Sequence, residues 1–343
     1  MPWDVGVFDS RADYKSEKQC QKTSFAFYQA VRDLLPVWVL EDMRTMEVFH
    51  WEEDGRACAY SPSEALLYAL VHDHQPYARY LLNTYSVSAL EMPSKSFCCC
   101  QLSTTPHLSM AVRYNRSSIL KMILNSAKDF SEEERLSYLN RRGCVHVEGG
   151  KTALHLACDL VRPECLILLL GHSACPYVTD RTGNTPLDCL LSQIGHSDLD
   201  MRLKHICLGY LILFMPNFRF QMKGQLRDNA ALWQRLIGEQ AYRWLSGQAP
   251  PSLFVQAMQK LIETVSAEQL ESLPLPDFLR PLDFRLQCDI STPGCDIILD
   301  RQGNPAPQQI PYLTSCDDLT EAGPLQKNNK TKPTRLSSSG AQG

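Results

Sequence analysis

The sequence lacks the features that would place the chain in a membrane or on a nucleic acid. Its 34 lysines and arginines are outnumbered by 38 aspartates and glutamates, so no positive excess is present to neutralise phosphates. The most apolar run, residues 206–215, is shorter than the roughly 20 residues that a bilayer-spanning helix needs. Residues 1–5 show no charged-then-apolar leader pattern. We expect a cytoplasmic protein without membrane or nucleic-acid partners, with the nucleus open as a second location.

Cysteine is plentiful, at 14 residues, but it lacks the regular spacing of a disulfide framework. Without a secretory leader, these thiols are expected to stay reduced. Metal-site patterns are incomplete as well, because neither Cys144 with His146 nor His72 with His74 has a second half at ligand spacing. No nucleophile stands in a recognisable catalytic context. We therefore expect a protein with no metal, no cofactor and no enzymatic activity.

Two copies of a short motif do stand out. The first reads Gly-Lys-Thr-Ala-Leu-His-Leu-Ala over residues 150–157, and the second reads Gly-Asn-Thr-Pro-Leu over residues 183–187, 33 residues further on. Glycine suits the turn, threonine can cap the helix that follows, and leucine faces the core. The pattern and its period resemble the ankyrin repeat. That resemblance implies stacked helix pairs, in which His155 ties neighbouring turns together.

Further copies of the repeat share its leucine-to-alanine spacing. Residues 66–69 and 108–111 match residues 154–157 in this respect, and Leu187 starts a degenerate fourth copy. Each early copy is separated from the next copy by more than the usual period, so we predict long inserted loops at residues 83–107 and 125–150. Before the first copy, residues 24–46 have helical periodicity that Pro36 interrupts. We expect this segment to cap the open end of the stack.

A second informative stretch follows the prolines at 250 and 251. Leu253, Ala257 and Leu261 recur every four residues and therefore lie along one face of a predicted helix. An extended, proline-held segment comes next, and it consists of Leu273, Pro274, Leu275 and Pro276. In this order and directly after an ankyrin array, the two elements resemble a SOCS box. That module is carried by one family of ubiquitin-ligase substrate receptors.

The SOCS-box resemblance implies specific partners. Leu253, Ala257 and Leu261 would bind elongin C of the elongin B/C pair, with Ala257 standing where that family usually has cysteine. Leu273 to Pro276 would bind cullin-5. The chain would then be the substrate-recognition subunit of a cullin-5 type RING ubiquitin ligase, promoting ubiquitination and degradation of a client. The alternative is an ankyrin scaffold without a ligase, in which Leu253 and Leu261 are buried against residues 226–247.

The client is implied by a narrower resemblance. Residues 24–38, 60–74 and 250–254 are similar to one subfamily of ankyrin-repeat proteins, and this implies inosine-monophosphate (IMP) dehydrogenase as a client. One predicted insertion also carries three consecutive cysteines, Cys98, Cys99 and Cys100. Three neighbours cannot all point inward, so we expect this loop to contact the client, or its thiols to tune that contact by their redox state.

Together these observations predict an all-α fold: an ankyrin-repeat solenoid with an N-terminal helical cap, a C-terminal SOCS-box-like helical module and a disordered tail. The predicted segments are a flexible N-terminus (1–22), a helical cap (23–60), about four repeats with long loops (61–197), a helical connector (198–247), the SOCS-box-like module (248–285) and the tail (286–343).

Overall fold

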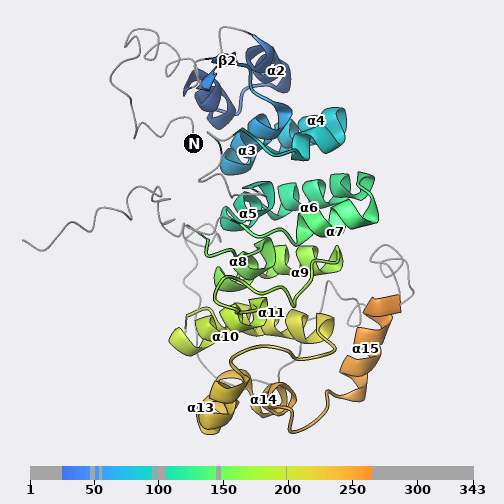
Figure 1. Ribbon diagram of the computed structural model, residues 1–343. Coiled ribbons are helices and arrows are strands. Elements are labelled where there is room, and N and C mark those ends of the chain that lie inside the picture. Colours follow the sequence, from blue (N-terminus) through green and yellow to red (C-terminus); the bar gives the residue numbers. More distant parts are fainter. Residues whose placement is uncertain are drawn as a thin grey trace, which may run out of the picture.

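The computed structural model describes residues 25–46, 51–53, 56–94, 97, 106–143, 148–197 and 199–264. The predicted flexible N-terminus and disordered tail therefore lie outside the described residues. Within them the chain is almost entirely helical, and its elements follow one another down a single elongated stack (Figure 1). No helix in this part of the chain is long and apolar enough to cross a bilayer.

Four antiparallel helix pairs form the centre of the stack. They are α3 (Pro62–His72) with α4 (Gln75–Tyr85), α5 (Pro106–Arg113) with α6 (Ser117–Ser126), α8 (Ala153–Asp159) with α9 (Pro163–Gly171), and α10 (Pro186–His196) with α11 (Met201–Phe214). The first helices of the pairs contact one another in succession, and the second helices do the same, so two parallel rows result (Figure 1). This arrangement confirms the predicted all-α ankyrin solenoid.

The threonines of the two sequence motifs cap the helices that follow them. Thr152 accepts a hydrogen bond from the backbone amide of His155 at 3.4 Å, and the ring Nδ1 of His155 accepts from the Thr152 amide at 3.2 Å. Thr185 and Asp188 form the same reciprocal pair at the start of α10. The second ring nitrogen of His155 donates to the carbonyl of Asn184 at 3.0 Å. His155 thus joins the third repeat to the turn of the fourth, as expected for a structural role.

The structure differs from the sequence-based boundaries in two places. Helix α11 packs beside α10 as the second helix of the fourth pair, so the stack continues past residue 197. The insertion after α6 holds a further helix, α7 (Glu132–Leu139), besides the short 3₁₀ turn η4 (Ala127–Asp129). Ser131 and Glu134 form a capping box at the start of α7, which is a strong local start signal. A second 3₁₀ turn, η2 (Ser86–Leu90), follows α4.

The N-terminal cap combines two helices and a hairpin. Helical residues 25–32 and α2 (Val37–Thr45) are separated around Pro36, which cannot continue a helix in its interior. Strands β1 (Trp51–Glu53) and β2 (Arg56–Cys58) then pair antiparallel, with Trp51 opposite Cys58. The cap therefore contains a β-hairpin in addition to the predicted helices. Asp and Gly stand between the strands in the sequence, a pair that favours two-residue hairpin turns.

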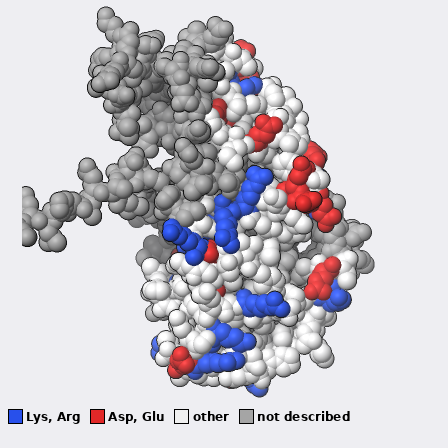
Figure 2. Space-filling view, in the orientation of Figure 1, with Lys and Arg blue, Asp and Glu red and all other residues white. Residues whose placement is uncertain are grey.

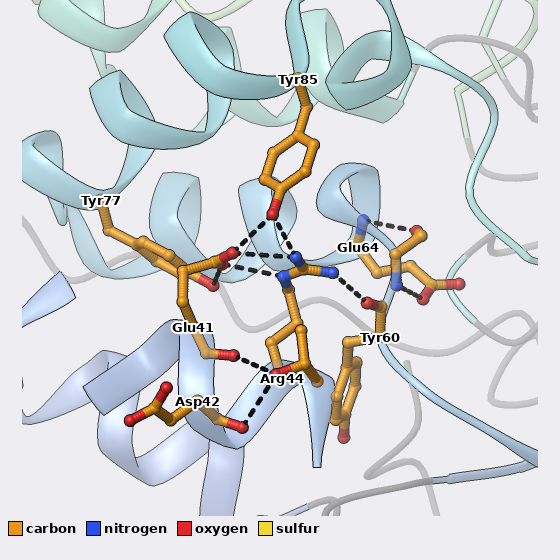
Figure 3. A network of polar contacts seen from close by, with 9 residues as sticks. Glu41, Asp42, Arg44, Tyr60, Glu64, Tyr77 and Tyr85 are labelled. Carbon is orange, nitrogen blue, oxygen red and sulfur yellow. Dashed lines mark hydrogen bonds and ion pairs between the residues drawn. The ribbon is translucent and has the colours of Figure 1, made fainter. Parts of the chain in front are cut away.

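A buried polar network joins α2 to the first repeat (Figure 3). Arg44 donates from Nε and Nη2 to the two carboxylate oxygens of Glu41, both at 2.8 Å, and from Nη1 to the carbonyl of Tyr60 at 3.0 Å. The hydroxyls of Tyr77 and Tyr85, both on α4, donate to the same carboxylate at 2.8 Å each. Burial would raise the pKa of Glu41, but these hydrogen bonds hold it below its ordinary value. The Arg44 and Glu41 charges are paired with each other and hydrogen-bonded to neighbouring groups. We therefore interpret this network as stabilising the fold.

The other end of the stack is closed by four short helices. They are α12 (Lys223–Asp228), α13 (Ala230–Ile237), α14 (Glu239–Ser246) and α15 (Leu253–Thr264). Helices α12 and α13 contact α14, whereas α15 contacts α11 of the last pair (Figure 1). Trp233 and Ile237 of α13 and Leu245 of α14 are buried there. Helix α15 therefore lies against the last repeat, steeply inclined to the row of second helices (Figure 1).

Candidate docking surface on the last helix

Helix α15 starts where the sequence predicts it, after two prolines. The hydroxyl of Ser252 accepts a hydrogen bond from the backbone amide of Val255 at 3.3 Å. The side chain of Gln256 donates back to the carbonyl of Pro251 at 2.6 Å. The first contact satisfies an amide that the first turn of a helix leaves without a partner, and the second ties the helix to the residue before its cap. The start of the helix, and with it the position of Leu253, is thereby determined by local sequence.

One face of α15 holds it against the repeat stack. Val255, Met258 and Gln259 are buried there, at three- and four-residue spacing. The Nε2 amide of Gln259 donates to the carbonyls of Ile212 at 2.7 Å and Met215 at 3.3 Å. These carbonyls lie at the end of α11 and in the residue after it, where an intrahelical partner is missing. Gln259 therefore caps α11 from the neighbouring helix and anchors α15.

The face turned away from the stack is apolar as well. Leu253 is 84% exposed, more than any other large apolar side chain that the structure describes, and Phe254 beside it is 44% exposed. Ala257, one turn further on, is exposed, whereas Leu261 is half-buried and packs partly against the core. Since a helix has 3.6 residues per turn, Leu253, Ala257 and Leu261 form one stripe that enters the core at its C-terminal end. We call Leu253, Phe254, Ala257 and Leu261 the outer face of α15.

The exposed position of Leu253 differs from what the scaffold alternative predicts. That alternative expects Leu253 and Leu261 to be buried against residues 226–247, and Leu253 is instead almost fully exposed. Burying an exposed leucine in a partner's pocket contributes about 2 kcal/mol, and contiguous exposed apolar side chains often mark protein–protein interaction sites. The sequence analysis did not single out Phe254. Its signal is its position directly after Leu253, on the same outer edge of the first turn.

Several predicted site residues lie outside the described residues. These are Leu273, Pro274, Leu275 and Pro276 of the cullin-binding segment, and Cys98, Cys99 and Cys100 of the client-binding insertion. Phe97, the neighbour of the cysteine run, is buried. Cys158, Cys165, Cys175, Cys189 and Cys207 are free thiols. Burial raises the pKa of Cys165, Cys189 and Cys207 to about 12. Thiols with such pKa values are protonated and unreactive near neutral pH.

The described residues contain no group of three or more His, Cys, Asp or Glu side chains arranged to hold a metal ion. The neighbours His72 and His74, considered in the sequence, have separate structural contacts. His72 stacks edge-on against Tyr28, with ring centroids 4.7 Å apart. His74 is hydrogen-bonded through Nε2 to the carbonyl of Leu35 at 3.0 Å. Both histidines therefore hold the N-terminal cap against the first repeat.

Comparison with known proteins agrees with this architecture. The ankyrin-repeat family profile matches residues 149–181, which contain α8 and α9. A mouse (Mus musculus) protein called ankyrin repeat domain-containing protein 9 is 49% identical over 327 residues, an alignment that covers 82% of this chain and 98% of the mouse protein. The helix pairs and the matched profile together define an ankyrin-repeat protein. More narrowly, the chain belongs to the ankyrin repeat domain-containing protein 9 family, which confirms the subfamily resemblance.

Membership of this family and the stacked repeats define the general role of the chain. Ankyrin repeats stack into extended surfaces that bind other proteins, and proteins built from them are typically adaptors without catalytic activity. The chain is therefore a repeat-based protein-interaction adaptor.

Proposed function

We propose that this adaptor is the substrate-recognition subunit of a cullin-5 type RING ubiquitin ligase. The observation that carries the proposal is the outer face of α15, where Leu253 and Ala257 are exposed on a helix whose opposite face is anchored in the fold. In the SOCS-box family, the equivalent positions bind elongin C. A helix held rigidly from behind can present its apolar side chains to a partner without first losing conformational freedom.

The proposed mechanism is proximity. Elongin B/C binds the outer face of α15, and cullin-5 binds the segment from Leu273 to Pro276. The client binds the repeats and their long loops. Tethering raises the effective concentration of client lysines near the ligase machinery, which transfers ubiquitin. This chain performs no chemistry in that scheme, and it acts in the cytoplasm.

The family resemblance supports IMP dehydrogenase as the client to test first. The insertion with Cys98, Cys99 and Cys100 is the proposed contact. Changing Cys99 and Cys100 to serine is expected to weaken client binding in a pull-down with purified IMP dehydrogenase. Unchanged binding would refute this contact.

The ligase proposal is tested by co-purification with elongin B/C and cullin-5. Leu253→Glu places a charge in the proposed apolar contact and should abolish elongin binding. Changing Leu273 to Pro276 to alanine should remove cullin-5 and leave elongin B/C bound. The matched control is Leu199→Glu, because Leu199 is also an exposed leucine, at 77%, but lies outside α15.

The outcomes separate the ligase from the scaffold. Loss of elongin B/C binding with Leu253→Glu, but not with Leu199→Glu, supports the proposal that the chain is a ligase receptor. If the wild-type chain does not bind elongin B/C at all, the proposal fails, and the chain is an ankyrin scaffold without ligase association.

A further inference from the structure

A pocket of about 550 Å³ opens between the turn before α10 and the loop after α11. Tyr177 and Phe220 supply aromatic walls, and Asn217, Arg219 and Gln221 supply polar groups. The exposed lining is mostly apolar. The pocket lies on turns at the last repeats and uses no residue of the outer face of α15.

The turn that forms one wall is rigid. Asp180 is buried, and its Oδ1 accepts hydrogen bonds from the amides of Thr182 at 2.8 Å and Asn184 at 2.9 Å and from the Thr182 hydroxyl at 2.7 Å. Although burial opposes it, this set of donors lowers the pKa of Asp180 below its ordinary value. The Asp180 carboxylate is therefore charged, but its Oδ1 atom already accepts three hydrogen bonds from the turn. Its role is to shape the turn.

The two walls of the pocket approach each other closely at Gly183. Gly183 has a φ of +84°, and a Cβ there would lie 2.4 Å from the side-chain nitrogen of Gln221. Only glycine fits this position without displacing Gln221. The opposite wall is tied down as well, because the amide of Asn217 donates to the Tyr177 hydroxyl at 3.2 Å. Both walls are thus preformed, which favours ligand binding.

The charge around the pocket is positive. Arg219 lines it and is exposed, and Arg181 is exposed at the tip of the same turn as Gly183. Among the described residues, neither arginine has an ion-pair partner. Of the acidic side chains nearby, Asp180 and Asp188 are buried and hydrogen-bonded, Asp188 also to the amide of Met222. Glu263, which acts on Tyr177 from α15, is paired with Lys260 at 3.2 Å. On the face of the molecule drawn in Figure 2, Lys and Arg are more frequent in the lower half, and Asp and Glu are more frequent along the upper right.

We infer that this pocket binds an acidic peptide segment of a protein client, with an aromatic side chain between Tyr177 and Phe220 and a neighbouring carboxylate on Arg219. The guanidinium of arginine can hold a carboxylate through two parallel hydrogen bonds. The amides of Asn217 and Gln221 can bind the peptide backbone. The assignment of the occupant as a client rests on the proposed ligase function, whereas the chemistry of the pocket does not.

The test is fluorescence anisotropy of labelled peptides with the full-length chain. The three probes carry the cores Glu-Phe-Glu-Glu, Glu-Ser-Glu-Glu and Lys-Phe-Lys-Lys in the same flanking sequence. The first probe should bind, and the other two should bind more weakly. Arg219→Glu should weaken binding of the first probe about tenfold, because a charge attraction becomes a repulsion. Arg219→Lys should weaken binding of the first probe less than Arg219→Glu does, since lysine keeps the positive charge.

The matched control is Arg79→Glu, an exposed arginine on α4 at the far end of the stack. This control should leave peptide binding within about twofold of wild type. Three results would each overturn the inference: no binding of the acidic aromatic probe, equal binding of all three probes, or equal binding by wild type and Arg219→Glu.

Co-purification with elongin B/C keeps this result separate from the ligase proposal. Arg219→Glu should retain elongin B/C, and Leu253→Glu should retain peptide binding. Peptide binding by a chain that binds no elongin would support the pocket and refute the ligase. The opposite pattern would support the ligase and refute the pocket.

Discussion

The two ends of the repeat stack are closed in different ways. At the N-terminal end, α2 is joined to the first repeat by buried charged and hydroxyl groups that point at one another (Figure 3). At the C-terminal end, α15 has apolar side chains on two faces, and only one of them is buried. A solenoid needs a cap at each end, and both caps also expose apolar side chains, Phe25, Leu34 and Trp38 at the N-terminal end and Leu253 and Phe254 at the C-terminal end. The two ends differ in what holds the cap in place: α2 is joined to the stack through a charged network, whereas α15 is held by buried apolar side chains and the amide of Gln259.

The largest effect is expected from breaking the N-terminal network. Arg44→Ala leaves the carboxylate of Glu41 buried without its cation, because Arg44 supplies two of its hydrogen bonds. Removing one partner of a buried ion pair typically lowers the free energy of unfolding by about 3 kcal/mol or more. Urea unfolding followed by circular dichroism measures this loss.

The double variant Glu41→Leu with Arg44→Met is the control for this prediction. It removes both charges together, so it should recover part of the loss. If the double variant loses more stability than Arg44→Ala, the ion pair does not act as a coupled unit.

The next largest loss of stability is expected at acidic pH. Burial lowers the pKa of His107 to about 4, although its Nε2 donates to the carbonyl of Ser63 at 3.0 Å. An unfolded histidine titrates near 6.5, so the unfolded state binds more protons between about pH 6.5 and 4. Stability is therefore lost as the pH falls through this window, by on the order of 3 kcal/mol. Urea unfolding of the wild type at several pH values measures the slope, and His107→Gln should flatten it.

Glu41 adds acid sensitivity at a lower pH. Its folded-state pKa lies below the ordinary carboxylate value, so its contribution is complete above the unfolded pKa and is lost as the pH falls through the folded pKa. His107 packs against the first repeat and Glu41 lies on α2, so acid should loosen the N-terminal end first. Hydrogen exchange that shows α13 and α14 opening before α3 on acidification would contradict this order.

Local signals account for the parts of this fold that the sequence predicts. The capping threonines at 152 and 185, the proline before α2 and the two prolines before α15 each act within a few residues, so they can be recognised without a structure. The outer stripe of α15 follows from spacing alone. The helix α7 also had a local signal, the Ser131–Glu134 capping box, but it lies in an insertion outside the repeat pattern.

Other features depend on contacts between distant residues. Arg44 and Tyr85 are 41 residues apart, and Gln259 and Ile212 are 47 apart. No spacing rule connects such positions, because stacking of the repeats brings them together. The pocket beside Gly183 is another case, since Tyr177 and Phe220 come from different turns. The sequence therefore predicts the outer face of α15 but not the inner face that holds it.

A smaller effect is expected on that inner face. Gln259→Ala removes the amide that donates to the carbonyls of Ile212 and Met215. Leaving buried carbonyls without a donor costs about 1–3 kcal/mol. Hydrogen exchange should increase in α15 more than in α8 and α9, because the lost bonds join only α11 and α15. Uniform loss across the whole chain would mean that α15 is part of one cooperative unit.

The smallest effect on stability is expected from Leu253→Glu. Leu253 is 84% exposed, and exposed substitutions usually change the free energy of unfolding by less than about 0.5 kcal/mol. The thermal midpoint of the isolated chain should therefore match that of the wild type. If the midpoint falls clearly, Leu253 is buried in solution, and loss of elongin binding by this variant would report misfolding. If stability is unchanged and elongin B/C is lost, the outer face acts only through its partner, whereas Arg44 at the opposite end of the stack acts on the stability of the fold.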